Sequence, residues 1–520
     1  MSVQSSIAST LGAFALVAGA GSVGAAPLST AQIDRIVARS MAEFQVPGIA
    51  VGIVKDGKLV FAKGYGVREL GKPGKIDADT IFAIGSNTKA FTTAALAILV
   101  DEGKLKWDDR VIDYLPDFRM YDPYVTREFT VRDLLTHRSG LGLGAGDLMF
   151  VPETDFTRRD VMRALRHLKP VTSFRSQFAY DNLLYVMAGE VVAAVSGSSW
   201  EDFVSARVLQ PLGMSGCAVS AGRLPATTNV AAPHSVVEGK LQKVAPLDVT
   251  LVGPAGGIQC SITGMSKWLA VQLARGQLPG GKTLFSAEQS EEMWTPQTPL
   301  AAQGKRAELT RTHFVSYGLG WGLEDFDGYE HIAHDGGVLG MVTHVSLMPE
   351  LKLGVLVFTN QQEGMALSAI SLPILEAYAG VTPHDWVALS KAAKDKQAQA
   401  AAASAKAAAP APAEGVDKLD LAPYAGTYED PWRGPVSIVK EGAGLRLTFS
   451  HTKGLTGSMV PLRPDVFVVH WDDRSLDADA YVRFKTEMSG KVVGFTMQAV
   501  SETTDFSFDF QDLEFTRAAH

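Results

Sequence analysis

A stretch without large apolar side chains divides this chain of 520 residues. Between residues 391 and 413, Ala, Lys and Gln dominate the sequence. Alanine-rich sequence permits a helix but offers no apolar face to bury, so we expect a helical or extended linker over residues 388–416. A chain of this length ordinarily forms more than one domain. The sequence therefore predicts a larger domain over residues 27–387 and a smaller one over residues 417–520.

The larger domain begins and ends with sequence typical of paired strands. Apolar runs at residues 49–54 and 59–62 flank a short polar turn that contains Gly57, and glycine tolerates the positive φ of a hairpin turn. A second hairpin is expected from residues 342–347 and 353–358. Between these hairpins the chain is mostly helical and rich in turns. This order predicts an α/β domain, with an antiparallel sheet flanked by helices and a helical subdomain.

The smaller domain consists of short runs in which apolar and polar residues alternate. Turn residues separate these runs at fairly regular intervals, which is typical of a small all-β barrel or sandwich. The runs are residues 436–439, 445–449, 466–469, 481–484 and 494–497.

The first residues of the chain have the pattern of a secretory signal. No Asp, Glu, Lys or Arg occurs before Asp34, and an apolar run at residues 11–20 leads to small residues that end at Ala26. We expect a signal peptide over residues 1–26 and a periplasmic or secreted protein. An uncleaved anchor is the alternative, although the run is short for spanning a bilayer. After removal of the leader, no stable insertion into a membrane is expected.

Composition and charge limit the classes of partner. The chain is 46% hydrophobic and 20% charged, which is the globular range, and its net charge of -8 gives no basic surface for nucleic acid. We therefore expect a small molecule or short peptide as substrate, and no metal or organic cofactor. Cys217 and Cys260 form no C-x-x-C pair. Export would permit a disulfide between them, but we expect two buried free thiols.

The pattern S-x-x-K occurs twice, at Ser86–Lys89 and at Ser450–Lys453. On a helix, residues three apart share a face, so the hydroxyl and the amine can meet, whereas on a strand they point to opposite faces. Ser86 precedes an Ala- and Leu-rich segment that ends at Gly103, as expected of a buried helix. Ser450 lies between β-like runs, so Ser86 and Lys89 are the candidates.

A helix start at Ser86 would favour nucleophilic chemistry. The free N–H groups there stabilise an oxyanion, and their field, together with burial, lowers the pKa of Lys89 so that it can accept a proton. The alternative is a helix-capping Ser86 followed by an exposed Lys89, and the S-x-x-K pattern alone would favour that alternative.

Two further motifs favour catalysis. Tyr180-Asp181-Asn182 is the only Y-x-N in the chain, and the only H-x-G begins at His334 and is followed by Gly337. In this order, the three motifs resemble those of the penicillin-recognising serine hydrolases, which include class C β-lactamases, DD-peptidases, D-aminopeptidases and related esterases. The resemblance covers roughly residues 30–385. Supporting stretches are residues 134–141, 211–214, 254–258 and 317–322.

The resemblance implies a role for each motif residue. Ser86 would attack a carbonyl group and become acylated, while Lys89 and Tyr180 would share its proton; which of the two is the base stays open. Tyr180 would protonate the leaving group, although a core tyrosine is the alternative. Asn182, Asp335 and Gly336 would bind substrate. The backbone N–H groups of Ser86 and Gly337 would form the oxyanion hole.

His334 stands where many members carry Lys, and it is mostly neutral at pH 7, which argues against strong β-lactamase activity. Its position in the motif still places it among the catalytic residues, and some peptidases of the superfamily carry His there. His137 is expected to be a structural loop residue. We expect a peptidase or amidase acting on small or D-residue-containing peptides. A carboxylesterase, a weak β-lactamase or a catalytically silent scaffold are the alternatives. The smaller domain resembles a lipocalin-like barrel, and a homo-oligomer is left open.

Overall fold

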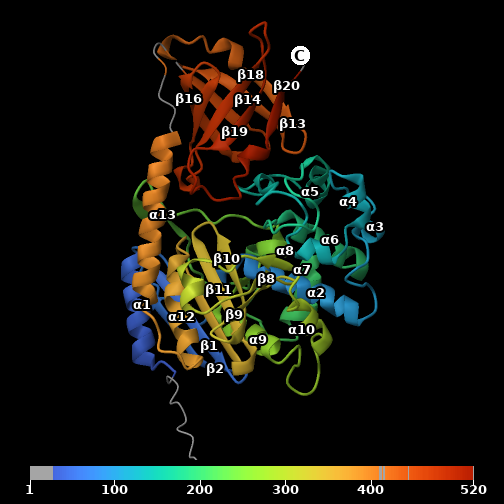
Figure 1. Cartoon of the computed structure of the whole chain (residues 1–520), viewed down its shortest axis with the longest axis vertical. Coiled ribbons are helices and arrows are strands. Elements are labelled where there is room, and N and C mark those ends of the chain that lie inside the picture. The colour runs from blue at the N-terminus through green and yellow to red at the C-terminus, as the bar shows by residue number, and fades with distance from the viewer. Residues whose placement is uncertain (1–26, 409–412, 414–415, 443, 519–520) are drawn as a thin grey trace, which may run out of the picture.

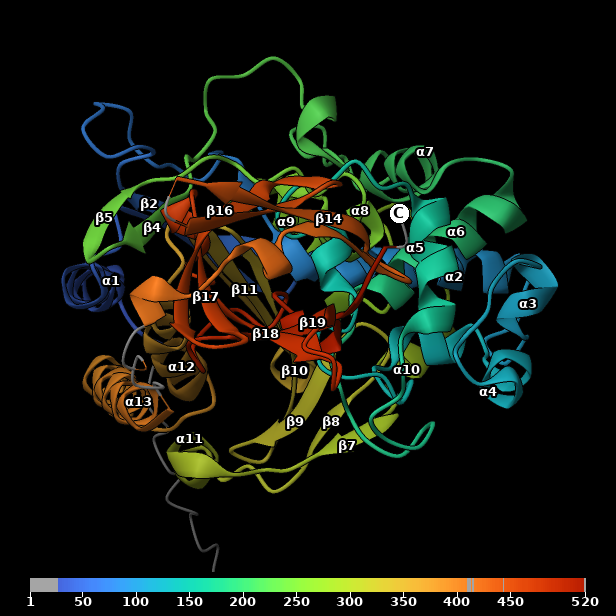
Figure 2. The ribbon, with the colours of Figure 1, turned by 90° about the horizontal axis from the view of Figure 1, so that it is seen from above.

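The computed structural model describes residues 27–408, 413, 416–442 and 444–518. The signal peptide predicted at residues 1–26 lies outside the described residues. A larger domain of sheet and helices carries a β-barrel, which lies above it in Figure 1 and over its middle in Figure 2.

An eight-stranded antiparallel sheet forms the centre of the larger domain. Strands from the two ends of the domain meet in it, because the first strand along the chain pairs with the last one of the domain, with Ile53 opposite Val355. Both predicted hairpins are confirmed. The strands, in order across the sheet, are β2 (Lys58–Gly66), β1 (Gly48–Lys55), β12 (Leu353–Thr359), β11 (Met341–Met348), β10 (Tyr329–Val338), β9 (Gly322–Phe326), β8 (Val315–Tyr317) and β7 (Thr298–Leu300).

The apolar run of β1 is buried on both faces of the sheet. Ile49, Val51 and Ile53 contribute to the core on one face, whereas Ala50 and Val54 contribute to the core on the other. A short continuous apolar run is what such a two-sided strand requires. Two small pairs lie outside this sheet: β3 (Phe82–Ala83) with β6 (Gln259–Cys260), and β4 (His234–Val237) with β5 (Lys240–Lys243).

Helices cover both faces of the sheet, and Figures 1 and 2 show α1, α12 and α13 on one side of it and α2, α6 and α7 on the other. From Lys89 to Leu99 every residue of α2 is buried, and Gly103 follows its end with φ +67°. The helices are α1 (Thr30–Phe44), α2 (Lys89–Asp101), α3 (Val111–Tyr114), α4 (Pro123–Glu128), α5 (Arg158–Ala164), α6 (Leu183–Ser196), α7 (Trp200–Val204), α8 (Gly253–Gly256), α9 (Ile262–Leu273), α10 (Ala287–Met293), α11 (Gly304–Leu309), α12 (Met365–Tyr378) and α13 (Trp386–Ala408).

Taken singly, no helix in the described part of the chain is long and apolar enough to cross a membrane. The segments Leu183–Ser196 and Trp200–Leu209 reach that length only together, with a bend of 77° between them. In this structure the first of the two is a largely buried helix of the larger domain.

The two cysteines form a disulfide, so the expectation of two free thiols is wrong. Ala218 and Gln259 exchange backbone hydrogen bonds, with N–O distances of 2.9 and 2.8 Å. In an antiparallel pairing the adjacent residues, Cys217 and Cys260, then stand opposite each other. The pairing joins segments that are 43 residues apart, and this register has no signature in the local sequence.

Helix α13 leaves the larger domain and runs toward the barrel (Figure 1). Its first turn is anchored, because Trp386 and Val387 are buried in the core that α1 and α12 share. Farther along, Lys394 pairs with Glu363, and most of residues 395–404 are exposed. The domain boundaries given above stay predictions.

The smaller domain is a closed eight-stranded antiparallel barrel, as the alternating runs predict. Each strand pairs with the next one along the chain, and β13 closes the barrel against β20. Its core holds buried aromatic rings, among them Tyr428, Phe449, Phe495 and Phe515. The strands are β13 (Gly426–Asp430), β14 (Gly434–Glu441), β15 (Gly444–Phe449), β16 (Thr452–Arg463), β17 (Val466–Trp471), β18 (Ala480–Thr486), β19 (Val492–Ala499) and β20 (Glu514–Arg517).

Candidate active site

Ser86 lies in a turn of 3₁₀ helix, Gly85–Thr88, which leads directly into α2. Lys89 is the first residue of α2, and its Nζ lies 3.0 Å from Ser86 Oγ. The structure therefore brings together the hydroxyl and the amine as the helical spacing predicts. The second S-x-x-K differs, because Ser450 is an exposed turn residue between β15 and β16.

The Lys89 side chain is fully buried, with 0% exposure. Besides Ser86, its amine contacts Asn182 Oδ1 at 2.7 Å and the carbonyl oxygen of Ala255 at 3.3 Å. Burial lowers the pKa of Lys89 to about 7, although the nearby Asp147 carboxyl opposes this shift. A substantial fraction of the amine is thus unprotonated near neutral pH, which is what a proton acceptor requires.

Tyr180 lies beside the same pair of groups. Its ring centroid is 4.6 Å from Lys89 Nζ, and the Ser86 hydroxyl lies near enough to its phenol to influence the pKa of Tyr180. Burial raises the pKa of Tyr180 well above its usual range, while the contact with Ser86 opposes that rise. The phenol therefore stays protonated at neutral pH and can donate a proton.

Strand β10 passes directly over the turn Gly85–Thr88 because glycines line the contact. A Cβ built on Gly85 would lie 2.6 Å from the Gly337 nitrogen, and one on Gly336 would lie 1.9 Å from the Ile84 carbonyl oxygen. No side chain fits at either place. Gly336 thus packs β10 against the turn, and Gly337 is brought next to Ser86.

His334 has both ring nitrogens engaged within the chain. Nδ1 lies 2.6 Å from the Asp335 carbonyl oxygen, so it must carry the proton, and Nε2 accepts from the Tyr317 hydroxyl at 2.9 Å. Burial, followed by the charge of Lys89, lowers the pKa of His334 to about 4. His334 is therefore neutral at pH 7. Asp335 is exposed, and its carboxyl lies 2.6 Å from His344 Nδ1.

His137 has a more direct place in the site than its sequence context indicated. It is buried, and its ring centroid lies 4.2 Å from that of Tyr180. Its Nδ1 accepts from the Asp181 backbone N–H at 3.1 Å, which holds the loop that carries Tyr180 and Asn182. It is thus a structural loop residue, as expected, but one that orients the site. In the sequence, only the nearby Ser139-Gly140 indicated a turn. In the structure, His137 itself has a φ of +52°.

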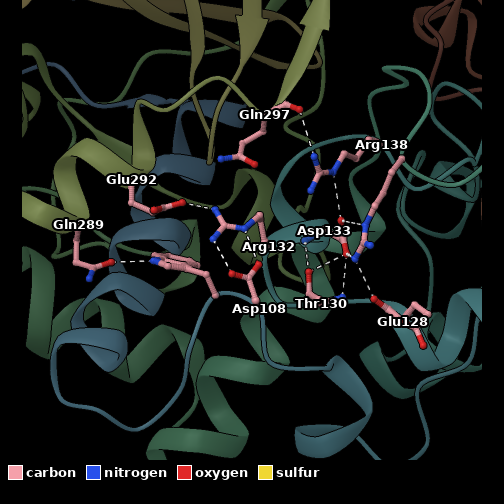
Figure 3. Close-up of polar contacts among 11 residues, drawn as sticks. Asp108, Glu128, Thr130, Arg132, Asp133, Arg138, Gln289, Glu292 and Gln297 are labelled. Carbon is pink, nitrogen blue, oxygen red and sulfur yellow. Dashed lines mark hydrogen bonds and ion pairs between the residues drawn. The ribbon is translucent and has the colours of Figure 1, made fainter.

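A buried carboxylate anchors the segment that carries His137. Asp133 is 0% exposed and accepts hydrogen bonds from Thr130 (Oγ1, 2.7 Å), Arg138 (Nε, 3.2 Å) and Arg175 (Nη2, 2.6 Å). Figure 3 shows Asp133 between Thr130 and Arg138, and the neighbouring Arg132 between Asp108 and Glu292. Several charge-assisted hydrogen bonds make this anchor stronger than a single surface ion pair.

The motif residues open into a cleft of about 1130 Å³. Its lining includes Ser86, Tyr180 and Asn182, and apolar side chains such as Leu247, Val249 and Val252. Arg306 and Lys394 are the arginine and lysine of this lining, and they are paired with Glu324 and Glu363. Barrel residues also reach the cleft, Asp477, Asp505 and Phe506 among them. The resemblance to a lipocalin-like barrel allows a role at the mouth of the active site, but the local sequence does not indicate which barrel residues reach it.

Within the described residues, no group of three or more His, Cys, Asp or Glu side chains is placed to hold a metal ion. The chemistry available at the site is that of a hydroxyl, a buried amine and a phenol within contact of one another. These are the components of nucleophilic acyl transfer, in which a hydroxyl attacks and neighbouring groups carry the proton.

Two family models match the chain. The Beta-lactamase model matches residues 33–378, and a domain of unknown function, DUF3471, matches residues 410–517. Together they cover the sheet-and-helix domain and the barrel.

Similar curated proteins include hydrolases and a penicillin-binding protein. A protein of Aspergillus campestris named Unguisins hydrolase ungD' is 28% identical over 341 residues, which are 62% of this chain and 60% of its own length. The chain therefore spans less than two thirds of that relative. Unguisins hydrolase ungD of Aspergillus violaceofuscus is 26% identical over 450 residues, 81% of this chain and 78% of its own. Penicillin-binding protein 4 of Amycolatopsis lactamdurans is 28% identical over 61% of this chain and 82% of its own.

Among solved structures, the octameric penicillin-binding protein homologue from Pyrococcus abyssi has a TM-score of 0.61 at 22% identity, covering 94% of this chain and 100% of its own. SurE has a TM-score of 0.55 at 21% identity, covering 94% of this chain and 99% of its own. At these identities the likeness concerns the fold alone.

The packing of β10 against the turn Gly85–Thr88 predicts the effect of two glycine substitutions on stability. We expect Gly336→Ala to lower the free energy of unfolding by ~1–3 kcal/mol, because its methyl group would overlap the Ile84 carbonyl. Gly337→Ala is the matched control, since a Cβ there meets nothing within 4 Å. Urea unfolding followed by tryptophan fluorescence measures both. If the two variants are equally stable, β10 is free to move away from the turn.

Proposed function

The chain belongs to the Beta-lactamase family, and we propose that it is a serine hydrolase working through an acyl-enzyme on Ser86. The observation that carries the proposal is the Lys89 amine, buried and 3.0 Å from the Ser86 hydroxyl. A lysine placed only as an exposed neighbour of a helix cap would be solvated and fully charged instead. Its burial supports the catalytic role over the capping role.

In the proposed reaction, Ser86 Oγ attacks the substrate carbonyl carbon and its proton passes to the unprotonated amine of Lys89. The oxyanion lies between the backbone N–H groups of Ser86 and Gly337. The bond to the leaving group then breaks, and Tyr180 supplies the proton that the leaving nitrogen or oxygen needs. Water attacks the resulting ester, with proton transfer in the reverse direction, and releases the acid and Ser86.

The pKa directions support a division of labour between the two proton-transfer groups. The lowered pKa of Lys89 suits the acceptor, and the raised pKa of Tyr180 suits the donor. Their protonation is coupled through Ser86, so the pair carries the proton together. His334 belongs to the site as a neutral group that holds Tyr317, and Asn182 holds both Lys89 and the substrate amide.

We propose a peptidase or amidase that acts on small or D-residue-containing peptides. The cleft's arginine and lysine are paired with carboxylates and His334 is neutral, so the lining favours substrates without a free carboxylate beside the scissile bond. Its apolar wall suits an uncharged side chain. A carboxylesterase or weak β-lactamase would use the same acyl-enzyme, and a silent scaffold would use none of this chemistry.

Location and assembly are also proposals. The leader pattern at residues 1–26 supports a periplasmic or secreted protein. The Pyrococcus abyssi homologue is described as octameric, which supports a homo-oligomer for this chain. Light scattering of the purified chain would measure its assembly.

Covalent labelling tests whether Ser86 is the nucleophile. A fluorophosphonate or fluorescent penicillin should attach to the full chain, and Ser86→Ala should abolish the label because it removes the attacking oxygen. Ser450→Ala is the matched control, because it removes the serine of the second S-x-x-K and should label fully. Fluorescence of the separated protein measures both. Equal labelling of Ser86→Ala and the parent chain would exclude the acyl-enzyme on Ser86.

The pH dependence of labelling tests whether Lys89 accepts the proton. The rate of fluorophosphonate labelling should rise with pH through a midpoint at about 7, because Lys89 accepts the proton only after its ammonium group has lost one. Stopped-time labelling over roughly pH 5 to 9 measures the midpoint. A flat profile over that range would show that no group with the pKa of Lys89 takes part.

A panel of peptide and ester substrates distinguishes a peptidase from a carboxylesterase. D-alanine p-nitroanilide should be hydrolysed faster than the L-enantiomer. The C-terminal amide of N-acetyl-D-Ala-D-Ala should exceed the free acid in kcat/KM by about tenfold or more, because Arg306 and Lys394 of the cleft are already paired with carboxylates. Release of p-nitroaniline and chromatography of the dipeptides measure the rates. Turnover of p-nitrophenyl esters alone would favour the carboxylesterase.

A further inference from the structure

The loop that joins β19 to β20 carries barrel residues into the larger domain. Asp509, which is 0% exposed, accepts hydrogen bonds from the backbone N–H groups of Gly146 (2.6 Å) and Leu148 (3.0 Å). Ser507, two residues earlier, donates through Oγ to Asp147 Oδ2 at 2.9 Å. The barrel thus holds the segment Gly146–Leu148 through both its backbone and the Asp147 side chain.

The gripped residue is connected to the catalytic amine. Asp147 is fully buried, and its Oδ2 also accepts from Asn182 Nδ2 at 2.8 Å. The other end of the Asn182 amide, Oδ1, lies 2.7 Å from Lys89 Nζ. A continuous chain of hydrogen bonds therefore runs from Ser507 through Asp147 and Asn182 to Lys89, and each of these side chains is at least nine-tenths buried.

The same loop touches Tyr180. The ring of Phe506 meets that of Tyr180 edge-on, with centroids 5.9 Å apart and an interplanar angle of 78°. Phe506 is 41% exposed and lines the cleft. Its backbone also fills the space beside Gly144, where a Cβ would lie 2.6 Å from the Phe506 oxygen, and Gly144 N–H donates to the Tyr180 carbonyl at 2.8 Å.

We propose that the DUF3471 barrel completes the active site of this chain. Ser507 and Asp509 are positioning residues that hold Lys89 through Asp147 and Asn182, and Phe506 forms the wall of the substrate cleft next to Tyr180. The proposal rests on the serine-hydrolase function proposed above. It assigns a role in the reaction to a domain whose family is described as one of unknown function.

The charge of Asp147 links the barrel to the proton chemistry. The titratable groups around Lys89 are Asp147, Asp181, Tyr180, Tyr185, His137 and His334. Burial, with the carboxyls of Asp181 and Asp509, raises the pKa of Asp147, whereas the hydrogen bond from Ser507 lowers it. Loss of that hydrogen bond would leave less negative charge beside Lys89, and so would lower the pKa of the amine further.

The experiment compares full-length variants by the pH profile of fluorophosphonate labelling at Ser86, with the urea unfolding midpoint as a measure of folding. In Ser507→Ala we expect the plateau rate at high pH to fall at least about fivefold, because the amine is held less firmly. The profile midpoint should move to lower pH by roughly 0.5 unit. Ser507→Thr keeps the hydroxyl and should restore the midpoint. Ser489→Ala, an exposed serine of another barrel loop, should change neither quantity.

Asp509→Asn and Phe506→Ala test the other two contacts. Asp509→Asn places an amide NH₂ against one of two backbone N–H donors, and should lower the plateau rate about as much as Ser507→Ala. Phe506→Ala should raise KM for an apolar p-nitrophenyl ester several-fold with an unchanged pH midpoint, since the wall contacts substrate and not the amine.

The outcomes separate the two proposals. If the parent chain gives no Ser86-dependent label, the serine-hydrolase function fails and the role of the barrel fails with it. If the parent labels and Ser507→Ala keeps both its rate and its midpoint, only the role of the barrel is overturned. The same holds if Ser507→Thr behaves like Ser507→Ala, or if the rate falls only in step with the unfolding midpoint. An unchanged KM in Phe506→Ala would show that Phe506 does not form a wall of the substrate cleft.

Discussion

The arrangement depends on a lysine amine buried without a salt bridge. Burying a full charge is costly unless it is paired, so the amine either loses its proton or finds compensation. Both apply to Lys89. Its pKa falls to about 7, so part of the amine loses its proton, and the amine contacts oxygen atoms of Ser86, Asn182 and Ala255. Those oxygen atoms come from three separate segments. Each segment must be held in place for Lys89 to be tolerated, and the same contacts aim it at Ser86.

The rest of the larger domain supplies these supports. The buried helix α2 fixes Lys89, and Asp133 with its arginines holds the segment on which His137 rests against Tyr180. Glycines in β10 and in the turn Gly85–Thr88 allow the sheet to approach the turn closely, because a Cβ on Gly85 or Gly336 would overlap the backbone opposite it. A buried helix therefore carries Lys89, contacts from neighbouring segments hold the loop of Tyr180, and the cleft opens beside them.

Local patterns were sufficient for part of this site. Helical spacing placed Lys89 against Ser86, because residues three apart on a helix must share a face. Motif order brought in Tyr180 and His334. The disulfide and the fit of Gly336 against Ile84 depend on register between distant segments, for which no local period exists. The neutral state of His334 was anticipated from its ordinary pKa, but its partner Tyr317 was not. Ser507 was out of reach of such reasoning, since it lies 360 residues from Asp147.

The contact between Ser507 and Asp147 links two domains that are far apart in the sequence. A barrel that only shared a chain with the hydrolase would contact it through exposed, polar surfaces, as domain interfaces commonly do. Here Asp509 and Ser507 are buried and end in hydrogen bonds to the loop around Asp147. Removing the barrel would leave the Gly146 and Leu148 N–H groups without their acceptor and Asp147 with one fewer donor. An uncompensated buried polar group costs more than the contact itself contributes. The larger domain therefore depends on the barrel to satisfy the hydrogen-bonding groups of Gly146–Leu148, and Asp147 in that segment contacts the Asn182 that holds Lys89.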